Sequence, residues 1–369
     1  MNQLFRWDQM GLFLLALAAG ILPFAVPEVC AAALREGLAL CCGPLLLSLF
    51  PFLVVSRLLI QCPESDLLAL PFRLAAWGIG IRTPCAARVL CIGFLGGFAP
   101  AASAAAQAVR TGQLTAEEAD ALLPACICSG PSFVVLTVGQ SLLGSAELGV
   151  LLFAAQITAN YLTAALLNRF AGVRSVKPGS AAPASPAPPR LDEILADAAI
   201  TYCKLCGFIL FFRMLAAGAG ALLPAGAGTL CSILLEVCSG CDLASRTGRW
   251  GSLLCCAALS VQGLSVLLQV RTICPPEMTL RPLYRARMLH LPLSLALFYL
   301  LLPGGEADVF STLPARVLLM RRVPPDCALL VFAVCCMAAC ALRSGIRQVE
   351  QKQMARNAGG CCINSKTLL

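Results

Sequence analysis

Apolar runs separated by short polar segments follow one another along most of this chain. A run of about 20 apolar residues matches the thickness of the bilayer core. We expect spanning segments at residues 11–27, 38–60, 146–168, 194–223, 285–302 and 325–343. The pattern predicts an all-α polytopic membrane protein, because helices satisfy every backbone amide within the segment.

Further apolar segments are interrupted by residues that weaken a helix. They form two pairs, 89–111 with 121–144 and 226–245 with 250–270. In GFLGGFAP (93–100), glycine and proline stand where a simple anchor would carry leucine. A broken or re-entrant helix is tolerated in hydrocarbon only where protein or a wet cavity surrounds it. With these segments we expect about eight spanning helices, some broken or re-entrant.

The two halves of the chain resemble one another. LFPFLVVSRLLI (49–60) aligns with LCGFILFFRMLA (205–216), and SGPSFVVLTV (129–138) aligns with QGLSVLLQV (262–270). These alignments place Arg57 on Arg213, Gly130 on Gly263 and Ser132 on Ser265. Both matches occur in the same order, beside glycine-rich interrupted segments. Internal repeats are a recurring plan of secondary transporters.

A proline-rich stretch separates the halves. RSVKPGSAAPASPAPPR (174–190) holds five prolines and predicts an extended linker without a core. The run at 11–26 lacks a small-residue cleavage site, so we interpret it as a first span and not as a secretory signal. We divide the chain into an N-terminal span (1–37), a first repeat (38–173), the linker (174–191), a second repeat (192–302), a last loop and span (303–343) and a basic tail (344–369).

Charge adds an orientation. The net charge is +8, but Lys and Arg lie in loops and the tail, which indicates cytoplasmic loops and lipid headgroups and not nucleic acid. If the basic loops 61–90, 169–190 and 271–287 share one side, one segment in each half must enter and leave without spanning. Segments 38–60 and 194–223 then run in opposite directions, so the repeats are inverted.

Glu236 is the sharpest single candidate for function. It lies in the middle of the apolar stretch SILLEVC, where a charged side chain costs about 2.5–3.5 kcal/mol on insertion scales. Such a residue faces a cavity or a partner. The alternatives are a solute site and a neutralising pair with Arg213 or Arg271. Arg57 and Arg213 lie near helix ends and are either charge partners of a site or snorkelling side chains.

The remaining candidates follow from the helix breaks and from uncharged polar residues. Exposed helix ends present free backbone groups, and helix N-termini attract anions. Close helix packing through small residues is the alternative for the glycines, and helix association is the alternative for the polar side chains. The expected solute-binding residues are Gly97, Pro100, Ser129, Gly130, Pro131, Ser132, Glu236, Gly240, Gln262, Gly263 and Ser265.

Catalysis and metal binding are not indicated. The chain has 22 cysteines, most of them inside apolar runs, where a thiol acts as a small hydrophobe. Cys203-x-x-Cys206 and Cys238-x-x-Cys241 resemble half a zinc site, but His290 is the only histidine. No phosphate-binding loop and no facing pair of carboxylates occurs. We therefore expect no enzyme, no metal and no cofactor. Thr115 and Glu118 form a capping-box pattern and predict a helix start.

Four motifs resemble a known family. SLFPFLVVSRLL (48–59), GFLGGFAP (93–100), GQLTAEEADALLPACICSGPSFVVLTVG (112–139) and LLEVCSGC (234–241) are similar to YlbJ-type sporulation integral membrane proteins of the nucleoside-recognition, or Gate, domain group. The resemblance covers about residues 40–270 and makes both repeats Gate-like. The residues that match the family pattern are Ser129, Gly130, Pro131, Phe133, Gly139, Glu236 and Gly240.

The resemblance implies a late sporulation protein in the membrane of a spore-forming bacterium, a forespore-surrounding membrane included. Proteins of this kind are linked to dipicolinate movement. We therefore expect a transporter-like protein that moves a small polar or anionic solute through a midplane site between the repeats. A non-transporting scaffold or regulator and a nucleoside carrier are the alternatives. The expected partners are the lipid bilayer and a small solute, with a homo-oligomer or other sporulation membrane proteins left open.

Overall fold

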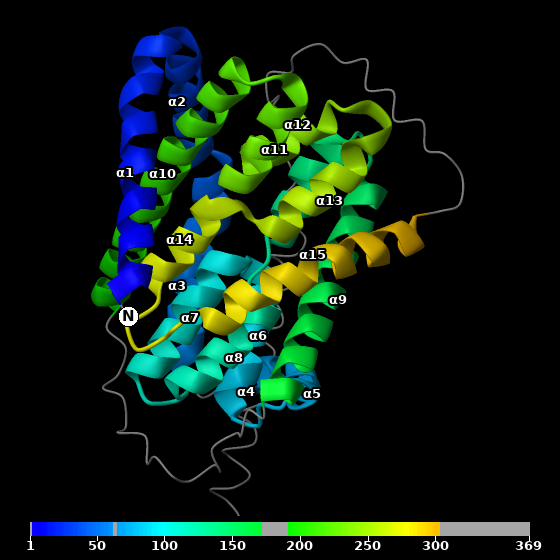
Figure 1. The fold of residues 1–369 in the computed structure, drawn as a ribbon. Helices are drawn as coiled ribbons and strands as arrows, with labels where there is room; N and C mark the ends of the chain where they lie inside the picture. Colours follow the sequence, from blue (N-terminus) through cyan, green and yellow to red (C-terminus); the bar gives the residue numbers. More distant parts are fainter. Residues whose placement is uncertain (1, 62–64, 172–190, 303–369) are drawn as a thin grey trace, which may run out of the picture.

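The computed structural model describes residues 2–61, 65–171 and 191–302, and this part of the chain contains helices and no strand (Figure 1). The helices of the first half are α1 (Asn2–Ala25), α2 (Pro27–Cys42), α3 (Pro44–Gln61), α4 (Ser65–Leu68), α5 (Leu70–Gly78), α6 (Pro84–Gly96), α7 (Phe98–Arg110), α8 (Ala116–Cys126), the π-helix η1 (Ser132–Leu142) and α9 (Ala146–Ala171). Those of the second half are α10 (Leu191–Leu222), α11 (Ala225–Leu235), α12 (Val237–Ser245), the 3₁₀-helix η2 (Gly248–Trp250), α13 (Gly251–Val261), α14 (Gly263–Ile273) and α15 (Arg281–Leu301).

Helices α6 and α7 form a hairpin whose two ends lie together. Thr83, just before α6, donates a 2.6 Å hydrogen bond to Glu118 at the start of α8. Arg88 on α6 donates to Gln113, which follows α7, and to the Ile60 carbonyl near the end of α3, both at 2.8 Å. The hairpin therefore enters and leaves at the end of the molecule where α3 stops.

Helices α11 and α12 form a second hairpin at the opposite end. Long α10 starts beside the end of α3, where Arg57 pairs with Asp197, and extends away from it. At its far end, the Cα of Gly220 lies 3.1 Å from a Cβ built on Gly228 of α11, and a Cβ on Gly220 would touch Leu243 of α12 at 3.7 Å. Figure 1 shows α11 and α12 above α6, α7 and α8.

Three helical stretches are long and apolar enough to cross a membrane: Ala146–Ala171, Leu191–Leu222 and Gly248–Ile273. The pair Phe13–Ala25 and Pro27–Cys42, bent by 110°, makes a fourth if it counts as one span. These apolar helices fit an α-helical membrane protein. They do not reach the expected eight, because breaks divide the other apolar segments into shorter helices. The expected span 325–343 and the basic tail lie outside the described residues.

Two expected segments have different boundaries in the structure. The span expected at 38–60 is divided at Gly43, where α2 ends and α3 begins with Pro44. Proline favours the first turn of a helix and cannot continue one from the preceding turn, which places the boundary there. The break expected at Gly240 lies earlier, at Glu236, and Gly240 is inside α12. A Cβ at Gly240 would lie 2.8 Å from the Ile233 Cα, so this glycine serves close helix packing.

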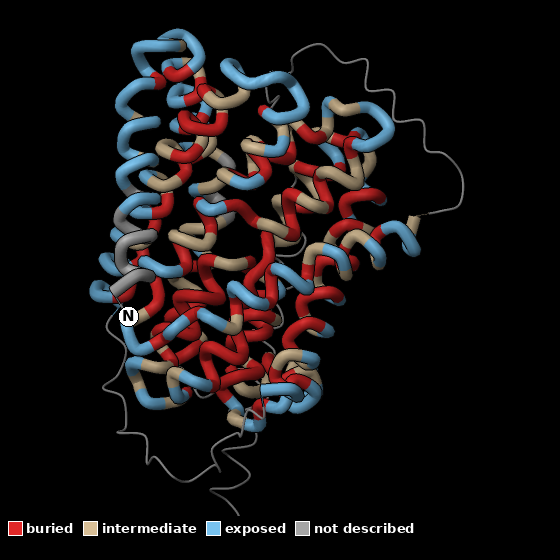
Figure 2. Tube along the Cα trace, viewed as in Figure 1, coloured by how far each residue is buried: buried red, intermediate tan, exposed pale blue. Residues whose placement is uncertain are grey.

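Burial is uneven over the molecule. Figure 2 shows mostly buried residues where α6, α7 and α8 lie, and mostly exposed residues along α1. The small residues Ala99 to Ala106 of α7 are all buried, which lets neighbouring helices approach closely. Large apolar side chains face outward, as lipid contact requires. The most exposed of them in the described part are Phe24, Leu74, Phe170, Met288 and Leu300.

Candidate functional site

The interrupted segments 89–111, 121–144, 226–245 and 250–270 each contain one helix break. These four breaks contact one another in two pairs, which we call crossings. In the first crossing, the break between α6 and α7 meets the break between α8 and η1. A Cβ on Gly97 would lie 2.7 Å from the Gly130 nitrogen. In the second crossing, the break between α11 and α12 meets the break between α13 and α14. A Cβ on Gly263 would lie 2.9 Å from the Glu236 nitrogen.

Glycine is required at two of these positions by backbone geometry. Gly97 has φ +81° and ψ −164°, a combination open essentially to glycine alone. Gly263 has φ +71°. The residue before it, Gln262, also has a positive φ of 62° and lies at the junction of α13 and α14. The breaks are therefore fixed local conformations and not frayed helix ends.

Glu236 is the first residue before α12 and its carboxylate caps that helix. One oxygen accepts the Cys238 amide at 2.9 Å and the other accepts the Ser239 amide at 2.7 Å. The residue is 2% exposed. A negative side chain is stabilised at a helix N-terminus, where free amides and the helix dipole present positive charge. This accounts for a carboxylate inside an apolar segment without a basic partner.

The alternative for Glu236, an ion pair with Arg213 or Arg271, is not found among the described residues. Arg213 pairs with Glu36 of α2 at 2.7 Å, and Arg271 donates to the Met278 carbonyl at 2.7 Å. Arg57, the other expected charge partner, pairs with Asp197 at 2.6 Å.

A central cavity of about 70 Å³ lies at the crossings and joins the two halves of the chain. The expected site residues on its wall are Ser129, Gly130, Ser132 and Glu236. Pro100, Pro131, Gly240, Gln262, Gly263 and Ser265 are expected site residues that do not line it. Gly97 does not line it either, but its neighbours Gly96 and Phe98 do. Gln269 is a further polar residue of the wall that is not among the expected solute-binding residues.

The central cavity has acceptor oxygens at Glu236 and Gln269 and hydroxyls at Ser129 and Ser132. Among the described residues that line it, Glu236 is the only acidic side chain and none is basic. The Gln269 amide nitrogen donates to the Ser265 hydroxyl at 3.0 Å, while its carbonyl oxygen is buried without a partner among the described residues. The hydroxyls of Ser129 and Ser132 complete the polar lining. Such a wall suits a solute that donates hydrogen bonds.

Arg287 is the main residue that sequence reasoning missed. It counted as a basic loop residue, yet it is 7% exposed and lies inside α15. It donates to the Ile127 carbonyl at 2.7 Å and to the Ser260 carbonyl at 3.3 Å. The Ile127 carbonyl also accepts from Asn160 and Gln262. Arg287 thus bridges the C-terminal ends of α8 and α13, where helix carbonyls lack their own partners.

Other expectations can be placed directly. The capping box of Thr115 and Glu118 is present at the start of α8. His290 is buried and contacts the Gln156 carbonyl at 3.2 Å, as a core histidine does. Among the described residues, no group of three or more His, Cys, Asp or Glu side chains could hold a metal ion.

Comparison of the chain with protein-family models, curated proteins and solved structures finds no match. Function must therefore be argued from the crossings and the cavity themselves.

Proposed function

We propose that this chain is a membrane carrier that binds a small polar solute in the central cavity between two inverted repeats. Each half has the same order of parts: a long helix, a hairpin with a break, a second broken segment, and a long helix. In the first half these are α3, α6–α7, α8–η1 and α9; in the second, α10, α11–α12, α13–α14 and α15. Broken helices that meet between inverted repeats are the usual place of a transporter site.

The direction of the elements supports the inversion. The aligned segments lie in α3 and α10, and α10 starts beside the end of α3, so the two run in opposite directions. The hairpins α6–α7 and α11–α12 enter from opposite ends of the molecule. This agrees with one re-entrant segment in each half. The observation that carries the proposal is the meeting of both hairpin tips with Glu236 at one cavity.

The lining narrows the solute class. Since Glu236 is the cavity's only acidic side chain and basic ones are absent from it, a solute with hydrogen-bond donors and no negative charge fits best. A nucleoside has such donors. Dipicolinate carries two carboxylates, which the Glu236 carboxylate would repel. A cavity of about 70 Å³ has room for a few water molecules, so either solute needs the hairpins to move apart.

Transport can be tested with the purified chain in proteoliposomes. We expect radiolabelled uridine to enter faster than into empty vesicles, and Glu236→Gln to lower the rate at least tenfold with equal reconstitution. Arg249→Gln is the matched control, because Arg249 lies at the surface against the exposed Trp250 ring. Dipicolinate uptake in the same vesicles tests the solute suggested by the family resemblance. If the folded protein moves neither solute, transport of these solutes by this chain is refuted.

The non-transporting scaffold gives a different result. In that case Glu236→Gln and Ser129→Ala leave solute entry at the empty-vesicle rate, as in the wild type, and change complex formation instead. Co-purification from a sporulating culture separates the two functions. The sporulation setting itself follows from the motif resemblance alone.

A further inference from the structure

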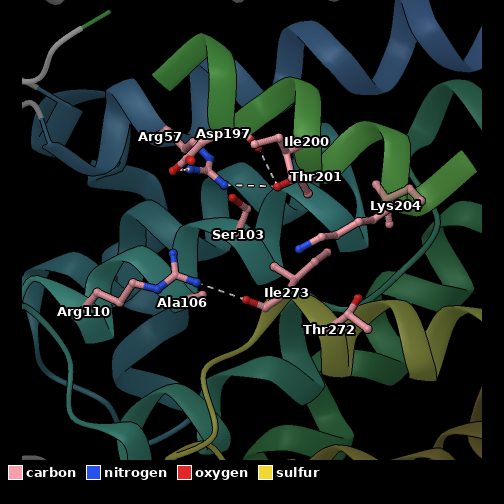
Figure 3. A pocket seen from close by; sticks show the side chains of 11 residues that line it. Arg57, Ser103, Ala106, Arg110, Asp197, Ile200, Thr201, Lys204, Thr272 and Ile273 are labelled. Atoms are coloured by element: carbon pink, nitrogen blue, oxygen red, sulfur yellow. Dashed lines mark hydrogen bonds and ion pairs between the residues drawn. The ribbon is translucent and has the colours of Figure 1, made fainter. Parts of the chain in front are cut away.

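A second cavity, of about 180 Å³, shares no lining residue with the central cavity, and we call it the basic pocket. It opens between α3, α7, α10 and α14, so both halves contribute to it. Figure 3 shows side chains from these helices around one space.

The charges of the basic pocket do not balance. It holds the cations Arg57, Arg110 and Lys204 and the single acid Asp197, which leaves two positive charges. Asp197 is engaged by Arg57 at 2.6 Å, and Arg57 also donates to the Thr201 hydroxyl at 3.2 Å. Arg57 is therefore held in place, while the other two cations lack an acidic partner in the described residues.

These two cations retain donors that the protein does not use. Arg110 makes one hydrogen bond, a 3.3 Å contact to the Ile273 carbonyl. Lys204 has no ion pair or hydrogen bond within the described residues, and Figure 3 shows its side chain extended into the pocket between Thr201 and Ile273. Ser103, which is buried beside Arg57, adds a hydroxyl. Elsewhere in the described part, Arg88, Arg213 and Arg246 each pair with a carboxylate.

We propose that the basic pocket binds a dianionic phosphate group. Two unbalanced positive charges match a dianion, and converging ammonium, guanidinium and hydroxyl donors match its clustered oxygens. The central cavity has the opposite character, with one carboxylate and no cation. The phosphate reaches the basic pocket either as a free small molecule or as the headgroup of an anionic lipid. The proposal does not depend on transport, since it concerns binding at a separate pocket.

Binding of free phosphate is tested on the full chain in a nonionic detergent at low chloride. We expect inorganic phosphate to raise the apparent melting temperature saturably, and added salt to weaken the effect. Lys204→Gln and Arg110→Gln should each weaken phosphate binding about tenfold, which corresponds to the loss of one charged hydrogen bond. Lys204→Arg should retain binding because it keeps the charge. Arg249→Gln, which removes a surface cation elsewhere, should bind as the wild type does.

Binding of a lipid headgroup is tested by native mass spectrometry. With phosphatidic acid added to the detergent-solubilised protein, we expect bound lipid on the wild type and less on the double variant Lys204→Gln, Arg110→Gln. Phosphatidylcholine at the same concentration is the reference lipid. Phosphate binding without phosphatidic acid retention assigns a free anion, and the reverse assigns a lipid headgroup. If neither ligand binds, or if the double variant binds both as tightly as the wild type, the proposal is overturned.

Discussion

Each crossing brings two helix breaks together, but the two crossings satisfy their helix ends in different ways. In the first, Gly97 precedes α7 and no side chain caps that helix. Pro100 occupies its first turn and lacks an amide hydrogen, so one unpaired donor is removed. In the second, the Glu236 carboxylate accepts two amides of α12. The start of α7 has one fewer amide donor to satisfy, whereas the start of α12 has a charged side chain that accepts two amides.

This difference separates a role in folding from a role in solute binding. The first crossing brings glycine against glycine, with the Arg287 guanidinium bound to the Ile127 carbonyl and not at the cavity wall. The second places the Glu236 carboxylate at the wall of the central cavity. We therefore expect substitution of Gly97 to act on folding, and substitutions in the second crossing to act on folding and on solute binding together.

The largest expected effect belongs to Gly97→Ala. A methyl group there would meet the Gly130 nitrogen at 2.7 Å and the Cys128 carbonyl at 3.2 Å, and both are backbone atoms. The conformation at Gly97 is also closed to alanine. We expect a loss of more than about 3 kcal/mol in the free energy of unfolding, since strain and overlap add. Unfolding in detergent, followed by intrinsic fluorescence, measures it.

Gly112→Ala is the control for Gly97→Ala. Gly112 has φ +69°, but a Cβ there meets nothing within 4 Å. Alanine at this position should cost only the left-handed conformation, about 1–2 kcal/mol. Equal losses for the two variants would show that the close approach at the first crossing is absent.

Gly263→Ala is the corresponding change in the second crossing. Its methyl group would lie 2.9 Å from the Glu236 nitrogen and from the Leu235 carbonyl. We expect a loss of about 2–3 kcal/mol, together with weaker solute binding, because the backbone of Glu236 must shift. Gly248→Ala, with φ +64° and open space around it, isolates the conformational part. Solute binding unchanged in a destabilised Gly263→Ala would contradict the coupling.

Glu236→Ala tests the charged cap. Loss of a capping side chain costs about 0.5–2 kcal/mol. Thr115→Ala is the matched control, because Thr115 caps α8 through a hydrogen bond from Glu118 at 3.1 Å and does not line the central cavity. We expect similar losses of stability from both, measured by thermal unfolding, and loss of solute binding only from Glu236→Ala. Loss of solute binding in both variants would mean that stability alone decides it.

The sequence carried much of this arrangement. Glycine and proline marked the breaks at Gly97 and Gly130, because these residues have distinct backbone limits. Long apolar runs marked α9 and α10. The Gly43–Pro44 pair is the same type of helix-breaking signal, and the prediction of one continuous span across it was wrong.

Three features needed the tertiary structure. Glu236 separates α11 from α12 without glycine or proline, because its side chain accepts two amides at the start of α12. Gln262 adopts a positive φ, which the sequence does not predict because this conformation is uncommon for residues other than glycine. Arg287 is adjacent to basic loop residues in sequence, but the packing of α15 against α8 and α13 buries it. There it binds helix carbonyls that lack a partner within their own helix. Charge bias alone assigns such a residue to the membrane surface.

The smallest expected effect belongs to Gly130→Ala, and it distinguishes the two partners within the first crossing. Gly130 has an ordinary φ, and a Cβ there would meet its nearest atom, the Gly96 carbonyl oxygen, at 3.5 Å. That is a normal contact, so we expect a change within about 0.5 kcal/mol. The steric restriction is thus one-sided: there is no room for a methyl group on Gly97 toward Gly130, while there is room for one on Gly130. Thermal unfolding beside Gly97→Ala measures this asymmetry, and a loss from Gly130→Ala as large as that from Gly97→Ala would remove it.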